Sequence, residues 1–272
     1  MNEADKSYWL LSQTSGIEET RNEKWQRNLP VLVGFQWLRA GWRDLATRPG
    51  PSLAYGLGIF IVSAVFVWLL VAFGLDYILF PALASFMIVA PILGIGLYAK
   101  SRDIEENEPV TLRRMLFVRP RAGAQVFFAG LLLCLLMLLW MRAAVLLSAL
   151  FFGVRPFPGL DHLVGVLFTT QIGWAMLAVG TIVGGLFAAF AFAVSAFSVP
   201  MLLDVRTDAL TAMGTSTALV WNNIVPMVVW GAIVLALFVV SLATGLFGLI
   251  VIFPLLGHAT WHGYKAVAVP EG

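Results

Sequence analysis

Charged residues are scarce in this 272-residue chain, at 12%, and it contains three histidines and one cysteine. A soluble domain carries about 25% charged residues. The 60% hydrophobic content therefore excludes an ordinary soluble enzyme and a disordered chain, and the single cysteine excludes a disulfide scaffold. The net charge of +2 arises from interleaved bases and acids, so we expect no nucleic-acid partner. The chain is expected in a membrane.

Most of the charges lie in residues 1–48 and 100–122, and the rest of the chain consists of long apolar runs. Only helices satisfy their own backbone in a bilayer, and about 20 apolar residues cross it. The predicted fold class is an all-α polytopic membrane protein with six transmembrane helices. Their expected ranges are Ser52–Gly74, Tyr77–Ala99, 123–150, Trp174–Ser198, Val225–Ala243 and Leu246–Tyr264, with an outer-surface segment at Val164–Ile172.

The basic residues predict the orientation. With the N-terminus inside, only Arg155 and Arg142 fall on the outer side, which is a strong positive-inside bias. We expect a multi-pass protein of the bacterial inner membrane with both termini cytoplasmic and no cleavable signal peptide. The expected regions are a cytoplasmic tail (1–30), an amphipathic surface helix (31–48), a six-helix transmembrane domain (49–266) and a C-terminal tail (267–272).

Within 31–48, an apolar stripe follows helical spacing, which indicates a helix lying on the inner membrane surface or, equally, packed on the cytoplasmic loops. The stripe comprises Val31, Phe35, Leu38, Trp42 and Leu45. Trp37 and Trp42 suit the headgroup region.

An internal repeat indicates three copies of one unit, each a surface helix followed by a transmembrane hairpin. Arg48-Pro49 precedes the first span and Arg119-Pro120 the third, and a third amphipathic stretch covers 207–221. Such repeats are typical of transporters, whose sites lie at repeat interfaces. Duplication of any stable hairpin would leave the same pattern. Pro91, Pro200 and Pro254 recur in the second arms, where we expect helix kinks that shape packing or act as hinges.

Small residues recur every fourth position in the fourth span, at Gly180, Gly184 and Ala188. This spacing favours close helix packing, with neighbours on this span.

His258 and His262 are separated by four residues, so both face one side of the sixth span, as metal or haem ligands would require. No cysteine or carboxylate lies near them in the sequence. Trp261 and Tyr264 between and beside them resemble an interfacial aromatic belt. We therefore expect interfacial packing rather than a ligand site, and predict neither metal nor cofactor.

Arg142 is the only charge well inside a predicted span. It can snorkel to the outer surface, pair with Asp76 or Asp161, or bind an anionic substrate. No phosphate-binding loop and no hydrolase or metalloprotease motif is present, so we expect no catalytic residue and no enzyme.

Three stretches, Arg39–Leu45 (RAGWRDL), Ser198–Asp204 (SVPMLLD) and Pro254–Tyr264 (PLLGHATWHGY), resemble a bacterial family of predicted multi-span membrane proteins, common in proteobacteria and known as a domain of unknown function. The resemblance implies an inner-membrane protein and brings no catalytic residue. Some relatives are labelled as a cytochrome c oxidase subunit, but three histidines are too few for a haem-copper centre of that kind.

Two functions remain open from the sequence. One is a non-catalytic structural, accessory or assembly component, with the lipid bilayer and other membrane-protein subunits as partners, a respiratory oxidase among them by analogy. The alternative is a small-solute transporter or channel at the hairpin interfaces, which would use Arg142, His258 and His262 as functional polar groups.

Overall fold

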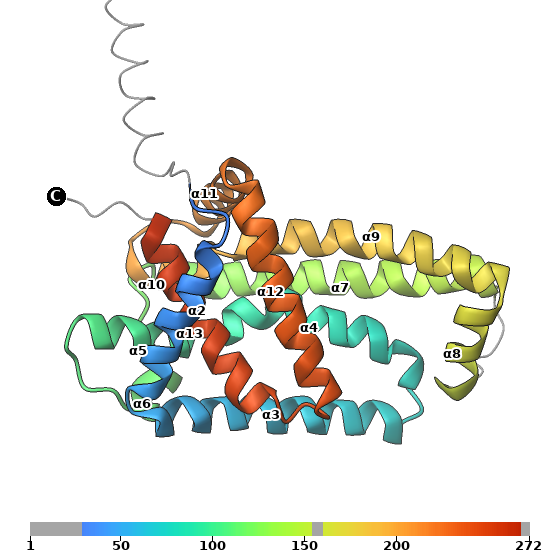
Figure 1. The fold of residues 1–272 in the computed structure, drawn as a ribbon, viewed down its shortest axis with the longest axis horizontal. Coiled ribbons are helices and arrows are strands. Elements are labelled where there is room, and N and C mark those ends of the chain that lie inside the picture. Colours follow the sequence, from blue (N-terminus) through green and yellow to red (C-terminus); the bar gives the residue numbers. More distant parts are fainter. Residues whose placement is uncertain (1–28, 154–159, 268–272) are drawn as a thin grey trace, which may run out of the picture.

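The computed structural model describes residues 29–153 and 160–267, and within these ranges the chain forms helices and turns without a strand (Figure 1). The all-helical prediction is confirmed for this part of the chain. The elements are α2 (Val33–Ala46), α3 (Pro49–Ala72), the short 3-10 helix η1 (Asp76–Ile78), α4 (Leu79–Leu93), α5 (Ile95–Glu105), α6 (Leu112–Leu116), α7 (Gln125–Phe152), α8 (Leu160–Thr169), α9 (Gln171–Ser195), α10 (Ser198–Asp204), α11 (Ala209–Asn222), α12 (Ile224–Ala243) and α13 (Leu249–Val267).

Five helical stretches of the described residues are long and apolar enough to cross a membrane. They are Pro49–Ala72, Leu79–Glu105, Gln125–Phe152, Gln171–Asp204 and Ile224–Ala243. Large apolar side chains on them stay exposed, such as Val62 at 69%, Phe127 at 79% and Leu186 at 67%. Contiguous apolar surface of this kind suits lipid rather than water.

The sixth expected span corresponds to α13, which is not among these five stretches. His258, His262 and Lys265 lie in its second half and lower its hydropathy. Instead of facing outward along its length, α13 packs on α2, α3 and α5. Trp261 and Tyr264 are almost fully buried, so the expectation that they form an interfacial belt is wrong.

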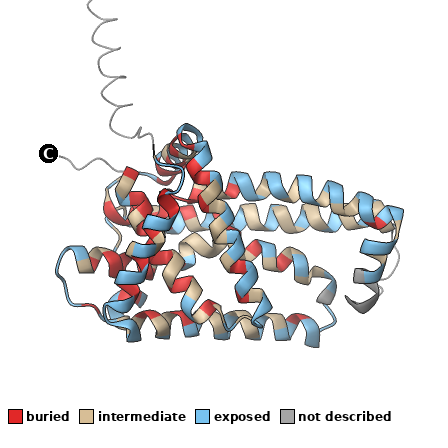
Figure 2. Ribbon diagram, viewed as in Figure 1, coloured by how far each residue is buried: buried red, intermediate tan, exposed pale blue. Residues whose placement is uncertain are grey.

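The helices fall into two directions. Figure 1 shows α3, α4, α7 and α9 running along the long axis of the molecule, whereas α12 and α13 run steeply across it. Buried residues concentrate where α2, α5, α10 and α13 meet, and the far ends of α7 and α9 are mostly exposed (Figure 2). We call this buried part the basic end of the bundle, because it contains Arg48, Lys100, Arg102, Arg121, Arg206 and Lys265.

The expected surface helix is α2, and it packs directly on α13. A Cβ added at Gly41 would lie 2.6 Å from the backbone nitrogen of Ala259, so the two backbones touch. Trp37 is 3% exposed and points into the protein core, unlike its predicted place among the headgroups, while Phe35 and Trp42 are exposed as expected. The face of α2 that contacts α13 carries Trp37 and Gly41, whereas Val31 of the predicted apolar stripe is exposed like Phe35 and Trp42.

The three prolines lie at different kinds of position. Pro91 is within α4, and the helix changes at Gly94, whose carbonyl accepts hydrogen bonds from both Leu97 and Tyr98. Pro200 is in the first turn of the short α10, and α13 continues through Pro254.

The expected surface segments at Val164–Ile172 and 207–221 overlap α8 and α11, and the tails fall largely outside the described residues.

Candidate functional site

Lys100 is a fully buried lysine at the basic end of the bundle. Its ammonium nitrogen donates to the carbonyl of Asp44 at 2.9 Å, the carbonyl of Arg48 at 3.2 Å and the hydroxyl of Ser52 at 2.8 Å. Three acceptors around one nitrogen match the three protons of an ammonium group. Lys100 therefore joins α5 to the end of α2 and the start of α3 as a charged donor.

His258 lies between two serines. Its Nε2 is 2.9 Å from the Ser52 hydroxyl, and its Nδ1 is 2.8 Å from the Ser101 hydroxyl. Because Lys100 can only donate, Ser52 accepts from it and has its own proton free for Nε2. We therefore assign the Nδ1–H tautomer to His258, which donates to Ser101.

Asp44 lies at the other end of this series of hydrogen bonds. The Ser101 hydroxyl donates to its carboxylate, and Nε2 of His262 lies 2.9 Å from Oδ2. Burial raises the pKa of the Asp44 carboxyl, but the hydrogen bonds from His262 and Ser101 outweigh it and lower the pKa below the ordinary value of 3.8. The resulting polar network consists of Lys100, Ser52, His258, Ser101, Asp44 and His262, from α2, α3, α5 and α13.

A second group of polar contacts ties α13 to its other neighbours. The Tyr264 hydroxyl donates to Asp204 at 3.0 Å, and Lys265 and Arg121 approach the same carboxylate at 3.5 and 3.8 Å. The Trp261 indole donates to Glu105 at 3.0 Å. These contacts give the aromatic side chains of α13 a structural role inside the protein.

The polar network contains a residue set that is familiar from hydrolases, a serine between a lysine and a histidine. However, Ser52, Lys100, Ser101 and His258 are all fully buried. A nucleophile requires room for a substrate carbonyl beside it. The arrangement as it stands fixes helices against each other, and His258 and His262 are both engaged by protein side chains.

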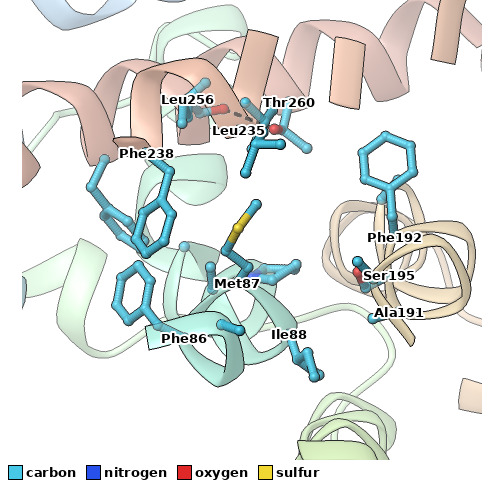
Figure 3. A pocket seen from close by; sticks show the side chains of 18 of the residues that line it. Phe86, Met87, Ile88, Ala191, Phe192, Ser195, Leu235, Phe238, Leu256 and Thr260 are labelled. Atoms are coloured by element: carbon cyan, nitrogen blue, oxygen red, sulfur yellow. Dashed lines mark hydrogen bonds between the residues drawn. The ribbon is translucent and has the colours of Figure 1, made fainter. Parts of the chain in front are cut away.

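The second candidate site is an apolar pocket of about 470 Å³ between α4, α9, α12 and α13 (Figure 3). Phe86, Met87, Phe192 and Phe238 are among the side chains around it. Trp140 of α7 also contributes to the lining. Its few polar groups are partly used internally. The Thr260 hydroxyl, for example, donates to the Leu256 carbonyl at 2.8 Å. A pocket of this size and lining fits an apolar molecule.

The small residues predicted to mediate helix packing border this pocket. Gly180, Gly184 and Ala188 all line it. A Cβ at Gly184 would meet the Trp140 ring at 3.1 Å, whereas one at Gly180 would meet nothing within 4 Å. Gly184 therefore lies close to the Trp140 ring, whereas space remains open beside Gly180.

Arg142 lies away from both sites, with an exposed side chain that does not line the apolar pocket. Among the described residues it has no hydrogen-bond or ion-pair partner; the side chains of Asp76 and Asp161, its predicted partners, lie outside the described set. Two residues earlier, the Trp140 indole donates to the Pro81 carbonyl at 3.0 Å. Arg142 is therefore level with the beginning of α4, far from the basic end.

Sequence reasoning found His258 and His262 and their common face, but missed Asp44, Ser52 and Lys100. A lone lysine at the end of an apolar run resembles an ordinary interfacial residue. The sequence offered no specific signal for these three residues, because single serine, lysine and aspartate residues in separate segments share no spacing rule.

Comparisons with curated proteins and with solved structures find no match for this chain. A family model does match residues 78–204, which extend from η1 through α10 and include Lys100, Ser101 and the α4 and α9 walls of the apolar pocket. Its description is "Predicted integral membrane protein (DUF2189)". With this match and its apolar helices, the chain is an integral membrane protein with several spans, and its residues 78–204 match the model of a domain of unknown function.

Proposed function

We propose that this protein is a non-catalytic accessory component of the bacterial inner membrane that holds an apolar chain, acyl or isoprenoid, inside its helix bundle. The observation that carries the proposal is the apolar pocket of about 470 Å³. Well-formed ligand sites measure about 300–1,000 Å³ and are mostly apolar. In a bilayer, a pocket lined in this way is filled from the surrounding lipid phase.

The closed polar network supports a non-catalytic role. No buried side-chain atom of this network lacks a hydrogen-bond partner, and Ser52 and Lys100 are not among the residues that line the apolar pocket. A catalytic centre would combine reactive groups with the space that receives the substrate. Here the reactive groups and the space are separate.

We further propose a topology in which the basic end is cytoplasmic, following the positive-inside rule, and six helices enter the membrane as three hairpins. The third hairpin is α12–α13. Phe247 in its turn stacks on Phe60, midway along α3, with 4.7 Å between ring centroids, and Phe238 stacks on Phe86 at 5.7 Å. We therefore place this turn near mid-membrane, so the hairpin enters and leaves on the cytoplasmic side.

A second candidate function is transport, because the apolar pocket lies where the three hairpins meet: α4, α9 and α12–α13 each contribute a wall. Sites at repeat interfaces are typical of transporters. The lining contains no charged residue, so the solute would be apolar or neutral. Flux in proteoliposomes that is abolished by closing the pocket would favour transport over the accessory role.

The test of pocket occupancy uses a matched pair of variants in α9. Ala188 lines the pocket and its neighbour Ala189 does not, so Ala188→Phe fills the space and Ala189→Phe adds the same ring elsewhere. The purified protein is photolabelled with a diazirine-bearing fatty acid. We expect labelled peptides from α4, α9 and α12 in the parent and in Ala189→Phe, and loss of most label in Ala188→Phe. Equal labelling of the two variants would overturn pocket binding.

The accessory role has its own test. In a mild detergent, the chain is expected to co-purify with the subunits of one larger membrane complex, and to lose that association in harsher detergent. Recovery of the chain only as a lone species under both conditions would contradict the accessory role while leaving the pocket result intact.

A further inference from the structure

A second concavity, of about 640 Å³, lies at the basic end between α5 and the segment that follows it. It is separate from the apolar pocket and from the polar network. It is lined by Ala99, Arg102, Asp103, Arg113, Arg114, Phe117, Val118 and Arg119. Four of these eight residues are arginines, against a single carboxylate.

The single carboxylate, Asp103, is already paired with an arginine. Asp103 accepts two hydrogen bonds from the guanidinium of Arg114, both at 3.0 Å, and Glu108 holds the same guanidinium at 3.1 Å. The two parallel hydrogen bonds to Asp103 raise the pKa of the Arg114 guanidinium. They also hold the Arg114 side chain in place in the wall of the concavity. Arg102, Arg113 and Arg119 have no carboxylate partner among the residues that the structure describes.

Arg102 is incompletely satisfied. One terminal nitrogen donates to the carbonyl of Leu203 at 3.0 Å, but its Nε–H is buried without a partner. That Nε–H is enclosed by the protein, so the groups of this concavity that are open to an anion are the exposed guanidinium groups of Arg113 and Arg119. A phosphate group, with several acceptor oxygens and negative charge, matches a guanidinium cluster of this kind.

The surroundings indicate where such a phosphate comes from. Leu116 and Phe117 are 60% and 75% exposed beside the concavity, on the segment between two membrane-embedded helices. Exposed apolar side chains next to clustered arginines are typical of the bilayer interface, where acyl chains and headgroups meet. We propose that this concavity binds the phosphate group of an anionic phospholipid, with Leu116 and Phe117 against its acyl chains.

The test compares two double variants of the full chain. Arg113→Gln with Arg119→Gln removes two lining charges, and Arg39→Gln with Arg43→Gln removes two exposed charges from α2 that do not line the concavity. Each protein is titrated with phosphatidylglycerol in phosphatidylcholine nanodiscs, and bound lipid is counted by native mass spectrometry. We expect affinity to fall about tenfold or more in the first variant and to change little in the second.

The remaining outcomes each decide against the proposal. Equal losses in both variants would mean a diffuse surface charge, and no loss in either would mean that the concavity binds no lipid phosphate. A further arm adds inorganic phosphate at increasing concentration. If phosphate alone displaces the lipid at matched concentration, the site takes a soluble anion and the lipid assignment fails. Thermal unfolding of both variants, expected to match the parent, guards against misfolding.

Discussion

Lys100 of α5 donates to the hydroxyl of Ser52 in α3 across 2.8 Å, although 48 residues separate them in the chain. Through Ser52 the lysine reaches His258, more than 150 residues further on. One buried cation thus connects three helices from the beginning, the middle and the end of the sequence. The predictions below follow from this contact and from the other close approaches between helices.

Replacing Lys100 by Met keeps the volume but removes all three donors. The carbonyls of Asp44 and Arg48 and the hydroxyl of Ser52 would then lose their partner, and each buried unsatisfied group costs about 1–3 kcal/mol. We expect Lys100→Met to destabilise the protein by about 3 kcal/mol or more, measured by thermal unfolding in detergent. Lys265→Met, at a half-exposed ion pair, serves as the control and should cost less than about 1 kcal/mol. Equal losses in the two would contradict this role.

Two glycines of α3 make a matched pair for helix packing. A Cβ at Gly56 would collide with the carbonyl oxygen of Ile250 in α13, whereas a Cβ at Gly58 would meet nothing within 4 Å. Gly56→Ala should therefore force α3 and α13 apart and lower the unfolding temperature. Gly58→Ala should leave it unchanged or raise it slightly, since alanine favours helix by about 1 kcal/mol over glycine. Equal tolerance of both substitutions would show that these helices do not touch there.

The contact between Asp44 and His262 predicts a pH dependence. The folded protein lowers the pKa of Asp44 below 3.8, so its stabilising contribution is present above that value and is lost as the pH falls through the folded-state pKa. The stability of the parent should decline in this acidic range. Asp44→Asn should be less stable at neutral pH and decline less steeply in acid. Asp208, whose pKa is also lowered, accounts for part of the remaining slope. An unchanged slope in Asp44→Asn would argue against the contact.

Cysteine labelling tests the membrane boundaries. From Gln125 to Arg142 the helix rises about 27 Å, close to the hydrocarbon thickness of about 30 Å. In a Cys134→Ser background, Arg142→Cys should react with an impermeant thiol reagent from outside the cell. Leu138→Cys, one turn deeper and equally lipid-facing at 58% exposure, should stay unlabelled. Arg119→Cys should react only after permeabilisation, and its labelling in intact cells would invert the proposed topology.

The sequence predicted the helices well because apolar length and turn residues are local signals. The predicted third and fifth spans begin and end within about two residues of α7 and α12. It could not predict which faces are buried. Trp37 and Trp261 resembled interfacial aromatics but lie in the core, because burial depends on the partner helix rather than on the residue itself.

The candidate site was predictable only in part. The four-residue spacing of His258 and His262 placed both on one face, as the structure has them. Their partners come from single polar residues spread over α2, α3 and α5, and no spacing rule connects such residues. The run of small residues in α9, Gly180, Gly184 and Ala188, was recognised in the sequence. The same pattern fits either a tight helix interface or an open space beside the helix. Only the tertiary structure distinguishes these two arrangements.

The pairing of α2 with α13 has a consequence for biosynthesis. Because Gly41 rests on Ala259 and His258 completes the bonds of Ser52 and Ser101, these contacts can form only after the ribosome has translated the 157 residues that separate Ser101 from His258. Until then, Ser52 and Ser101 lack the imidazole that joins them in the folded protein. The polar network is therefore completed by α13, after α2, α3 and α5 have been synthesised.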